Sequence, residues 1–156
     1  MKTLRCAALV VVWMLCAAAQ AAGPIRLDDS GSHTIPPNVQ MQWRHVPGSS
    51  ITSPSAGQME AALRVAIQID TQAHAGKTGR IYMVLPADGG AALQLQWQTQ
   101  GRLLPGRLSP GDRALVFQGL LPGPRLTDQL QLQVLADGQW AAASRRLSLH
   151  FELEER

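Results

Sequence analysis

The sequence predicts an all-β domain, and three observations over residues 59–156 support this prediction. Apolar and polar residues alternate along several segments, as expected for strands with one buried face. Turn signals such as Asp88-Gly89-Gly90 and Pro122-Gly123-Pro124 separate these segments at intervals of about 10 to 15 residues. No segment shows convincing helical periodicity. We therefore expect an immunoglobulin-like antiparallel β-sandwich of about seven strands, with a small β-barrel as the alternative, because alternation alone does not distinguish them.

The expected strands share a run of alternating or continuous apolar residues that ends at a turn signal. Six of them span residues 59–70, 79–86, 93–98, 113–117, 129–134 and 147–154. A further strand is expected near Trp43 or Trp140. The pair Asp137-Gly138 is a typical hairpin turn, so we expect a strand returning from Trp140 to pair with the strand before it.

The N-terminus has the pattern of a secretory signal peptide over residues 1–21. Lys2 and Arg5 precede an apolar run that is shorter than the roughly 20 residues a bilayer-spanning helix needs. Ala19-Gln20-Ala21 supplies small residues at the cleavage site, so we expect export to the periplasm or the medium and no stable membrane span after cleavage. An uncleaved anchor is one alternative. Lipidation at Cys16 is another, although Leu15 stands where a lipoprotein signal needs a small residue.

Removing the signal peptide changes the composition in two ways that bear on function. Both cysteines, Cys6 and Cys16, leave with it, so the mature chain has no disulfide or thiol chemistry. Of the 14 Lys and Arg residues, Lys2 and Arg5 are lost, and 12 basic side chains then face 11 acidic ones. A nearly neutral chain without a basic stripe is not expected to bind nucleic acid.

Residues 22–58 precede the predicted domain of residues 59–156 and are rich in Pro, Ser and Gly. We interpret them as an extended arm or linker. Met41 and Trp43 alternate with glutamines within it, and we expect these two side chains to dock on the domain, because a tryptophan is uncommon in disordered chain.

Motifs for catalysis, metals or cofactors are weak in this sequence. Gly76-Lys77-Thr78 matches the end of a phosphate-binding loop, but the first glycine of that motif is missing and a strand is expected to follow. No Gly-x-Ser-x-Gly occurs. His33, His45, His74 and His150 show no metal-ligand spacing. We expect a non-catalytic protein without metal or cofactor, and an envelope hydrolase is only a minor alternative.

The most unusual surface feature is a set of glutamines on the polar sides of two strands. Glutamine can donate and accept hydrogen bonds without the desolvation penalty of a full charge, so such faces suit contact with a protein or a sugar. We expect a binding or assembly module of the cell envelope or surface that acts through sheet-face or sheet-edge contacts with a protein partner. Carbohydrate binding is the alternative, with stacking on Trp140. Trp97 is the other candidate, but it shares the apolar side of its strand with Leu93 and Leu95, and we expect this side in the core. The predicted interaction residues are Gln94, Gln96, Gln98, Gln129, Gln131, Gln133 and Trp140.

In general plan, residues 59–154 are similar to bacterial fimbrial subunits and their chaperones, which are exported immunoglobulin-like sandwiches that work by strand exchange. The resemblance covers architecture only. The mature chain lacks the cysteine pair common in those subunits and is too short for a two-domain chaperone. A fimbrial or secretion accessory role is what the resemblance implies, and fold-level similarity by itself carries little functional weight.

Overall fold

The computed structural model describes residues 23–35, 40–44, 57–87, 92–138 and 147–156. The predicted signal peptide at residues 1–21 and the predicted strand start at Trp140 lie outside these ranges. Within them, no helix has the length and apolar character needed to cross a membrane.

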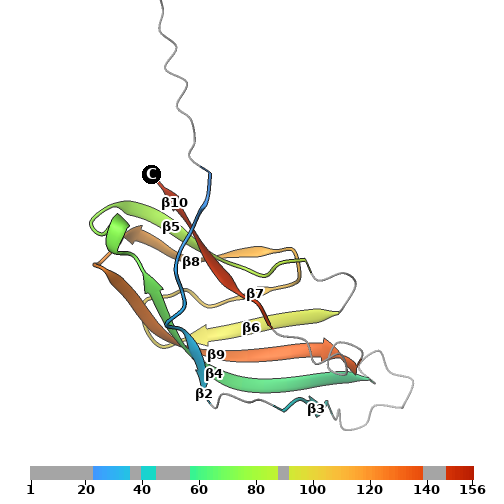
Figure 1. The fold of residues 1–156 in the computed structure, drawn as a ribbon. Coiled ribbons are helices and arrows are strands. Elements are labelled where there is room, and N and C mark those ends of the chain that lie inside the picture. Colours follow the sequence, from blue (N-terminus) through green and yellow to red (C-terminus); the bar gives the residue numbers. More distant parts are fainter. Residues whose placement is uncertain (1–22, 36–39, 45–56, 88–91, 139–146) are drawn as a thin grey trace, which may run out of the picture.

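The described chain forms ten strands in two antiparallel sheets, which form two layers in Figure 1. The strands are β1 (Ile25–Arg26), β2 (His33–Ile35), β3 (Gln42–Trp43), β4 (Gln58–Asp70), β5 (Thr78–Val84), β6 (Leu93–Thr99), β7 (Gly106–Leu108), β8 (Arg113–Leu120), β9 (Arg125–Asp137) and β10 (His150–Glu155), with a short 3-10 helix, η1 (Gln72–His74), between β4 and β5. The four-stranded sheet has the order β1-β10-β5-β8, and the six-stranded sheet has the order β2-β4-β9-β6-β7, with β3 also paired to β4.

All six strands expected from the sequence are present, and their alternation explains the core. Ile81 and Met83 of β5 and Phe151 of β10 are buried from one sheet, and Leu95 and Trp97 of β6 are buried from the other. These side chains belong to a single apolar cluster that both sheets contribute to. The fold is therefore a β-sandwich-like pair of sheets, and the alternative of a closed barrel is wrong.

The connections between strands differ from the sequence-based expectation. In the part of the chain the structure describes, only two pairs of consecutive strands are neighbours in a sheet, β3 with β4 and β6 with β7. The hairpin predicted at Asp137-Gly138 is wrong: β9 is flanked by β4 and β6, with Asp137 opposite Gln58, and β10 lies in the other sheet between β1 and β5. Both sides of β9 are occupied, which leaves no position for a hairpin partner.

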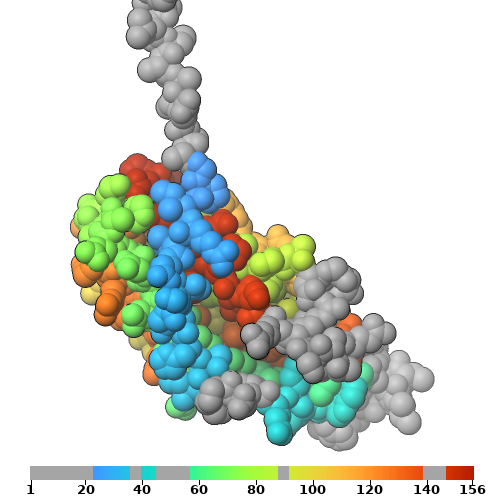
Figure 2. Space-filling model, in the orientation of Figure 1, coloured from blue at the N-terminus to red at the C-terminus, as the bar shows by residue number. Residues whose placement is uncertain are grey.

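The described parts of residues 22–58 form edge strands of both sheets. β1 pairs with β10, whereas β2 and β3 pair with β4 of the other sheet, so residues 23–35 pass from one sheet to the other along one side of the molecule (blue in Figure 2). Leu27 is buried between these strands, and its amide donates a hydrogen bond to the Phe151 carbonyl at 2.9 Å. The docking predicted for Met41 is confirmed, because it packs on the core. Trp43 contacts the domain near Gly138 but remains 64% exposed, so its prediction was only partly right.

Trp97 fixes the inner side of β6 and the loop that follows it. Its indole Nε1 donates a hydrogen bond to the Leu104 carbonyl at 2.9 Å. Gly106 of β7 lies opposite Trp97 in the register, and a Cβ at this glycine would approach the indole Cζ2 to 2.7 Å. The Asp128 carboxylate accepts a hydrogen bond from the Leu103 amide at 2.7 Å and holds the same loop from β9. The strand that carries the glutamines is thus anchored rigidly on its buried side.

Candidate functional site

The six-stranded sheet turns a glutamine-rich face away from the core. The pairing of β6 with β9 places Gln98 opposite Gln131 and Gln96 opposite Gln133, so glutamines from the two strands form two adjacent rows. The rows continue into β4, where Arg64 lies opposite Gln131 and Ala62 lies opposite Gln133. Residues that face each other across antiparallel strands have side chains on the same side of the sheet. We call this surface, made by residues 62 and 64 of β4, 96 and 98 of β6, and 131 and 133 of β9, the glutamine face.

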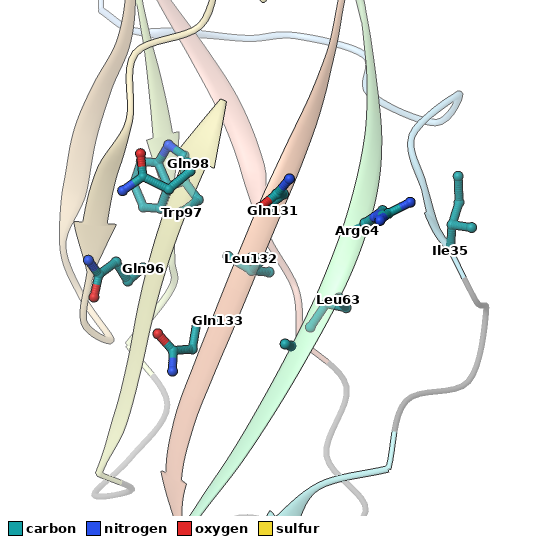
Figure 3. A pocket seen from close by; sticks show the side chains of 10 residues that line it. Ile35, Leu63, Arg64, Gln96, Trp97, Gln98, Gln131, Leu132 and Gln133 are labelled. Atoms are coloured by element: carbon teal, nitrogen blue, oxygen red, sulfur yellow. The ribbon is translucent and has the colours of Figure 1, made fainter. Parts of the chain in front are cut away.

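A hollow with a volume of about 690 Å³ lies over the glutamine face. Figure 3 shows the side chains that line it, with Ile35 of β2 at one side and the glutamines of β6 at the other. A volume of this size is within the range of small-ligand sites. Ala62 contributes to the hollow because its small side chain leaves space between longer neighbours. Its lining residues are Ile35, Ala62, Leu63, Arg64, Gln96, Trp97, Gln98, Gln131, Leu132 and Gln133.

The polar groups of the glutamine face are open to solvent. Gln96, Gln98, Gln131 and Gln133 are all exposed. Within the described ranges, their side-chain amides make no hydrogen bond to another residue. Each amide offers two donor hydrogens and one acceptor oxygen. The face can therefore form several hydrogen bonds with a bound chain without first breaking contacts within the protein.

The predicted interaction residues fall into three groups. Four of the glutamines line the hollow, as described above. Gln94 and Gln129 lie on the same face but beyond the hollow, opposite Leu135 and Ala66 respectively. Trp140 lies outside the described residues.

Sequence reasoning missed Arg64, Ala62 and Ile35, which complete the hollow. The alternation of β4 does put Ala62 and Arg64 on its polar side, which is a signal that the sequence contains. It does not show that β4 is the neighbour of β9, because strand order depends on long-range pairing.

Trp97 is not available for stacking on a ligand. It is only 1% exposed, and its indole nitrogen is already hydrogen-bonded to Leu104. The expectation that this tryptophan belongs to the core is confirmed. The hollow has no exposed aromatic ring among its lining residues.

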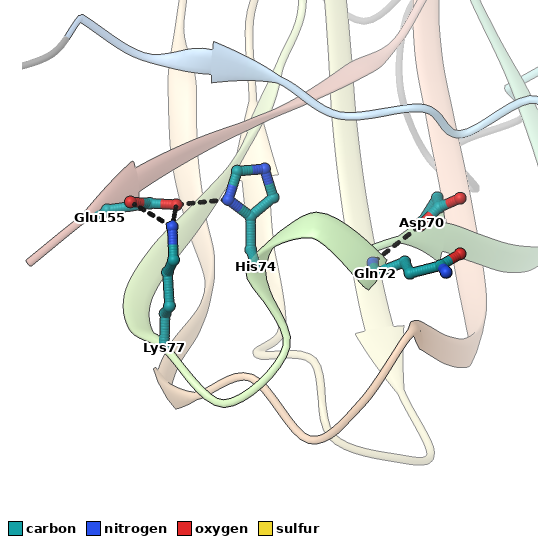
Figure 4. A network of polar contacts seen from close by, with 5 residues as sticks. All are labelled: Asp70, Gln72, His74, Lys77 and Glu155. Atoms are coloured by element: carbon teal, nitrogen blue, oxygen red, sulfur yellow. Dashed lines mark hydrogen bonds and ion pairs between the residues drawn. The ribbon is translucent and has the colours of Figure 1, made fainter.

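The Gly76-Lys77-Thr78 segment forms a turn and does not precede a helix. Gly76 has a positive φ of 78°, and β5 begins at Thr78. The Lys77 ammonium contacts both carboxylate oxygens of Glu155 at 3.0 and 3.1 Å, and His74 contacts the same carboxylate (Figure 4). These contacts, that of Lys77 first, lower the pKa of Glu155 below its usual range. A lysine held by a carboxylate, in front of a strand, does not form a phosphate-binding loop.

The outer face of the four-stranded sheet carries charged residues that pair with one another. Arg113 contacts Glu154 at 2.7 Å and lies over the Tyr82 ring at 4.3 Å. The hydrogen bond to Glu154 raises the pKa of Arg113. His150 and Glu152 approach to 3.3 Å. Among the residues that the structure describes, no three His, Cys, Asp or Glu side chains are grouped as metal ligands would be.

No protein-family model matches this chain, and comparisons with curated proteins and with solved structures give no match. The function is therefore inferred from the residues of the chain itself.

Proposed function

We propose that the protein is an exported, non-catalytic binding module of the cell envelope or surface, and that the glutamine face binds a partner protein. The observation that supports this most directly is the hollow of about 690 Å³ over that face, lined by four exposed glutamines whose amides have no partner within the described chain. Strands β6 and β9 hold the backbones of these glutamines at fixed spacing, so only their side chains have to be ordered on binding.

The chemistry of the lining favours an extended polypeptide as the partner. Amide side chains can pair with main-chain N–H and C=O groups in either direction, and they do so without the cost of desolvating a full charge. Ile35 is 43% exposed at the side of the hollow and offers an apolar contact. The short edge strands β1, β2 and β7 provide a second, sheet-edge mode of contact.

We further propose that the two sheets form a sandwich of the immunoglobulin-like type, with residues 1–21 removed on export. The support for the fold is the pair of antiparallel sheets around one core, with chain connections that pass repeatedly from one sheet to the other. The support for export is the sequence pattern of Lys2, Arg5 and Ala19-Gln20-Ala21. A fimbrial or secretion accessory role fits this combination.

Carbohydrate binding is a weaker alternative. Glutamine amides suit sugar hydroxyls, but the described lining has no exposed aromatic ring for stacking. A glycan array with the exported protein distinguishes the two functions, because the protein-binding proposal predicts no glycan signal that depends on Gln96 or Gln131.

The proposal is tested by changing the glutamine face and asking which proteins remain bound in envelope extract. We expect Gln96→Glu combined with Gln131→Glu to remove the bound partner, because the two added carboxylates must be desolvated on binding. The matched control is Gln118→Glu on β8, an exposed glutamine of the other sheet. Identical partner lists for the double variant and the unaltered protein would contradict the proposal.

A further inference from the structure

Arg64 is the charged residue of the hollow. Its neighbours across the strands are Ile35 of β2 and Gln131 of β9, with Gln98 of β6 beyond. Its side chain is exposed. Among the described residues it takes part in no ion pair or hydrogen bond, unlike Arg113, which contacts Glu154 at 2.7 Å. The guanidinium is therefore free to bind a ligand.

The residues around this guanidinium favour a ligand with a single negative charge. Every other residue that lines the hollow is uncharged, so the lining has a net charge of +1. A carboxylate suits such a site, because a guanidinium can form two parallel hydrogen bonds with it. The amides of Gln98 and Gln131 can donate further hydrogen bonds to the same group. A second carboxylate would find no cation in the hollow.

The position of Ile35 adds a second requirement. It lies directly opposite Arg64 in the pairing of β2 with β4, and it is 43% exposed. Side chains at such positions are about 5 Å apart at their Cβ atoms. When the carboxylate of a ligand binds Arg64, another part of the same ligand therefore contacts the apolar side chain of Ile35. Side chains on the same side of an extended segment are two positions apart, so a segment with an apolar residue two positions from an acidic one meets both requirements.

We propose that Arg64 anchors the partner by binding the single carboxylate of an extended, otherwise uncharged peptide segment, in which an apolar residue two positions from the acidic one contacts Ile35. This inference rests on the proposed protein-binding function of the glutamine face and specifies its ligand. A carboxylated sugar fits less well, because Trp97 is buried and the lining offers no stacking surface.

The experiment uses the protein purified after export and two capped peptides of about eight residues, a length of roughly 27 Å when extended. Both consist of Ser, Thr and Gln around a central triplet, which is Glu-Ser-Leu in the first peptide and Gln-Ser-Leu in the second. Affinities are measured by NMR titration, in which the side-chain amide signals of the glutamines report where the peptide binds. The variants are Arg64→Gln, Arg64→Lys and Arg107→Gln. Arg107 is the matched control, because it lies opposite Gln96 on the same sheet but does not line the hollow.

We expect the Glu-Ser-Leu peptide to bind about tenfold more tightly than the Gln-Ser-Leu peptide. Arg64→Gln should remove this difference, Arg64→Lys should retain part of it because the charge remains but the paired hydrogen bonds do not, and Arg107→Gln should leave it unchanged. Unfolding midpoints should stay the same in all three variants, since the altered side chains are exposed.

Several results would overturn the inference. Equal affinity for the two peptides, with binding still weakened by Gln131→Ala, would remove the role of Arg64 and leave the proposed function intact. Equal losses of affinity in Arg64→Gln and Arg107→Gln would show nonspecific charge attraction.

Other results would identify a different ligand. Tighter Arg64-dependent binding of a glucuronate oligomer would make a sugar the ligand. A dimer in sedimentation experiments that Arg64→Gln dissociates would make a second copy of the chain the occupant. Failure of both peptides, together with an unchanged partner list for the Gln96 and Gln131 double variant, would contradict the proposed function as well.

Discussion

The outer faces of the two sheets differ in whether their polar side chains pair with other residues of the protein. On the four-stranded sheet, Arg113 is bound by Glu154 and Tyr82, and His150 contacts Glu152. Most charged side chains of this face are thus paired within the protein, although the buried Nε of Arg80 has no hydrogen-bond partner among the described residues. On the six-stranded sheet, the amides of Gln96, Gln98, Gln131 and Gln133 are open, and they surround a hollow. When the charged side chains of a face already pair with one another, few of them are free to bind a partner. The amides of the glutamine face make no hydrogen bond within the described chain, and this difference supports our proposal that the face binds a partner.

The strongest contrast lies within one strand, between Trp97 and its neighbours Gln96 and Gln98. We expect Trp97→Ala to lower the free energy of unfolding by about 3–5 kcal/mol, because it empties the largest buried volume of the core. Chemical denaturation measures this change. A loss below about 1 kcal/mol would mean that the core tolerates collapse around β6 and that the glutamines are held less rigidly than we argue.

Gly106→Ala should have the next largest effect. The added Cβ would approach the Trp97 ring to 2.7 Å, so either the ring or β7 must move. We expect a loss of about 1–3 kcal/mol, typical of overpacking. Thermal unfolding of this variant against Gly123→Ala, where a Cβ would meet nothing within 4 Å, provides the comparison. Equal melting temperatures would show that this close approach is relieved without cost.

The charged face should give a smaller and salt-sensitive effect. A double-mutant cycle with Arg113→Gln and Glu154→Gln should yield a coupling energy of about 0.2–1 kcal/mol, because both groups are partly exposed. We expect the coupling to shrink as salt rises to about 1 M, since screening weakens exposed pairs. A coupling energy of zero at low salt would mean that the charged side chains of the four-stranded sheet do not stabilise one another. The contrast with the glutamine face would then be lost.

The glutamine face should contribute least to folding. Gln131→Ala and Gln133→Ala are each expected to change the free energy of unfolding by less than about 0.5 kcal/mol, because the side chains are exposed and no described residue hydrogen-bonds to them. Denaturation curves of these variants should overlay that of the unaltered protein. A clear loss of stability would assign the glutamines a structural role in place of binding.

The sequence predicted strands and faces well, because alternation is a local signal. Leu95 and Trp97 were expected to be buried and Gln96 and Gln98 exposed, and the structure agrees. It did not predict the short strands β1, β2 and β7, whose two or three residues are too few to show a period.

The sequence did not predict which strands pair with one another. The turn at Asp137-Gly138 suggested a hairpin, yet β9 pairs with β4 and β6, because burial of its apolar side is decided by contacts distant in sequence. The contribution of Arg64 to the site was missed for the same reason. Its polar side was evident from the pattern of β4, but its place beside Gln131 was not.

Site-specific photo-crosslinking in cells that express the protein shows which of the two outer faces contacts a partner. A photoreactive residue is placed at Gln131 on the glutamine face or at Gln118 on the outer face of the four-stranded sheet, both of which are exposed glutamines. If the glutamine face binds a partner protein, position 131 gives a discrete crosslinked partner and position 118 gives none. Equal crosslinking from both positions, or crosslinking from position 118 alone, would contradict this proposal.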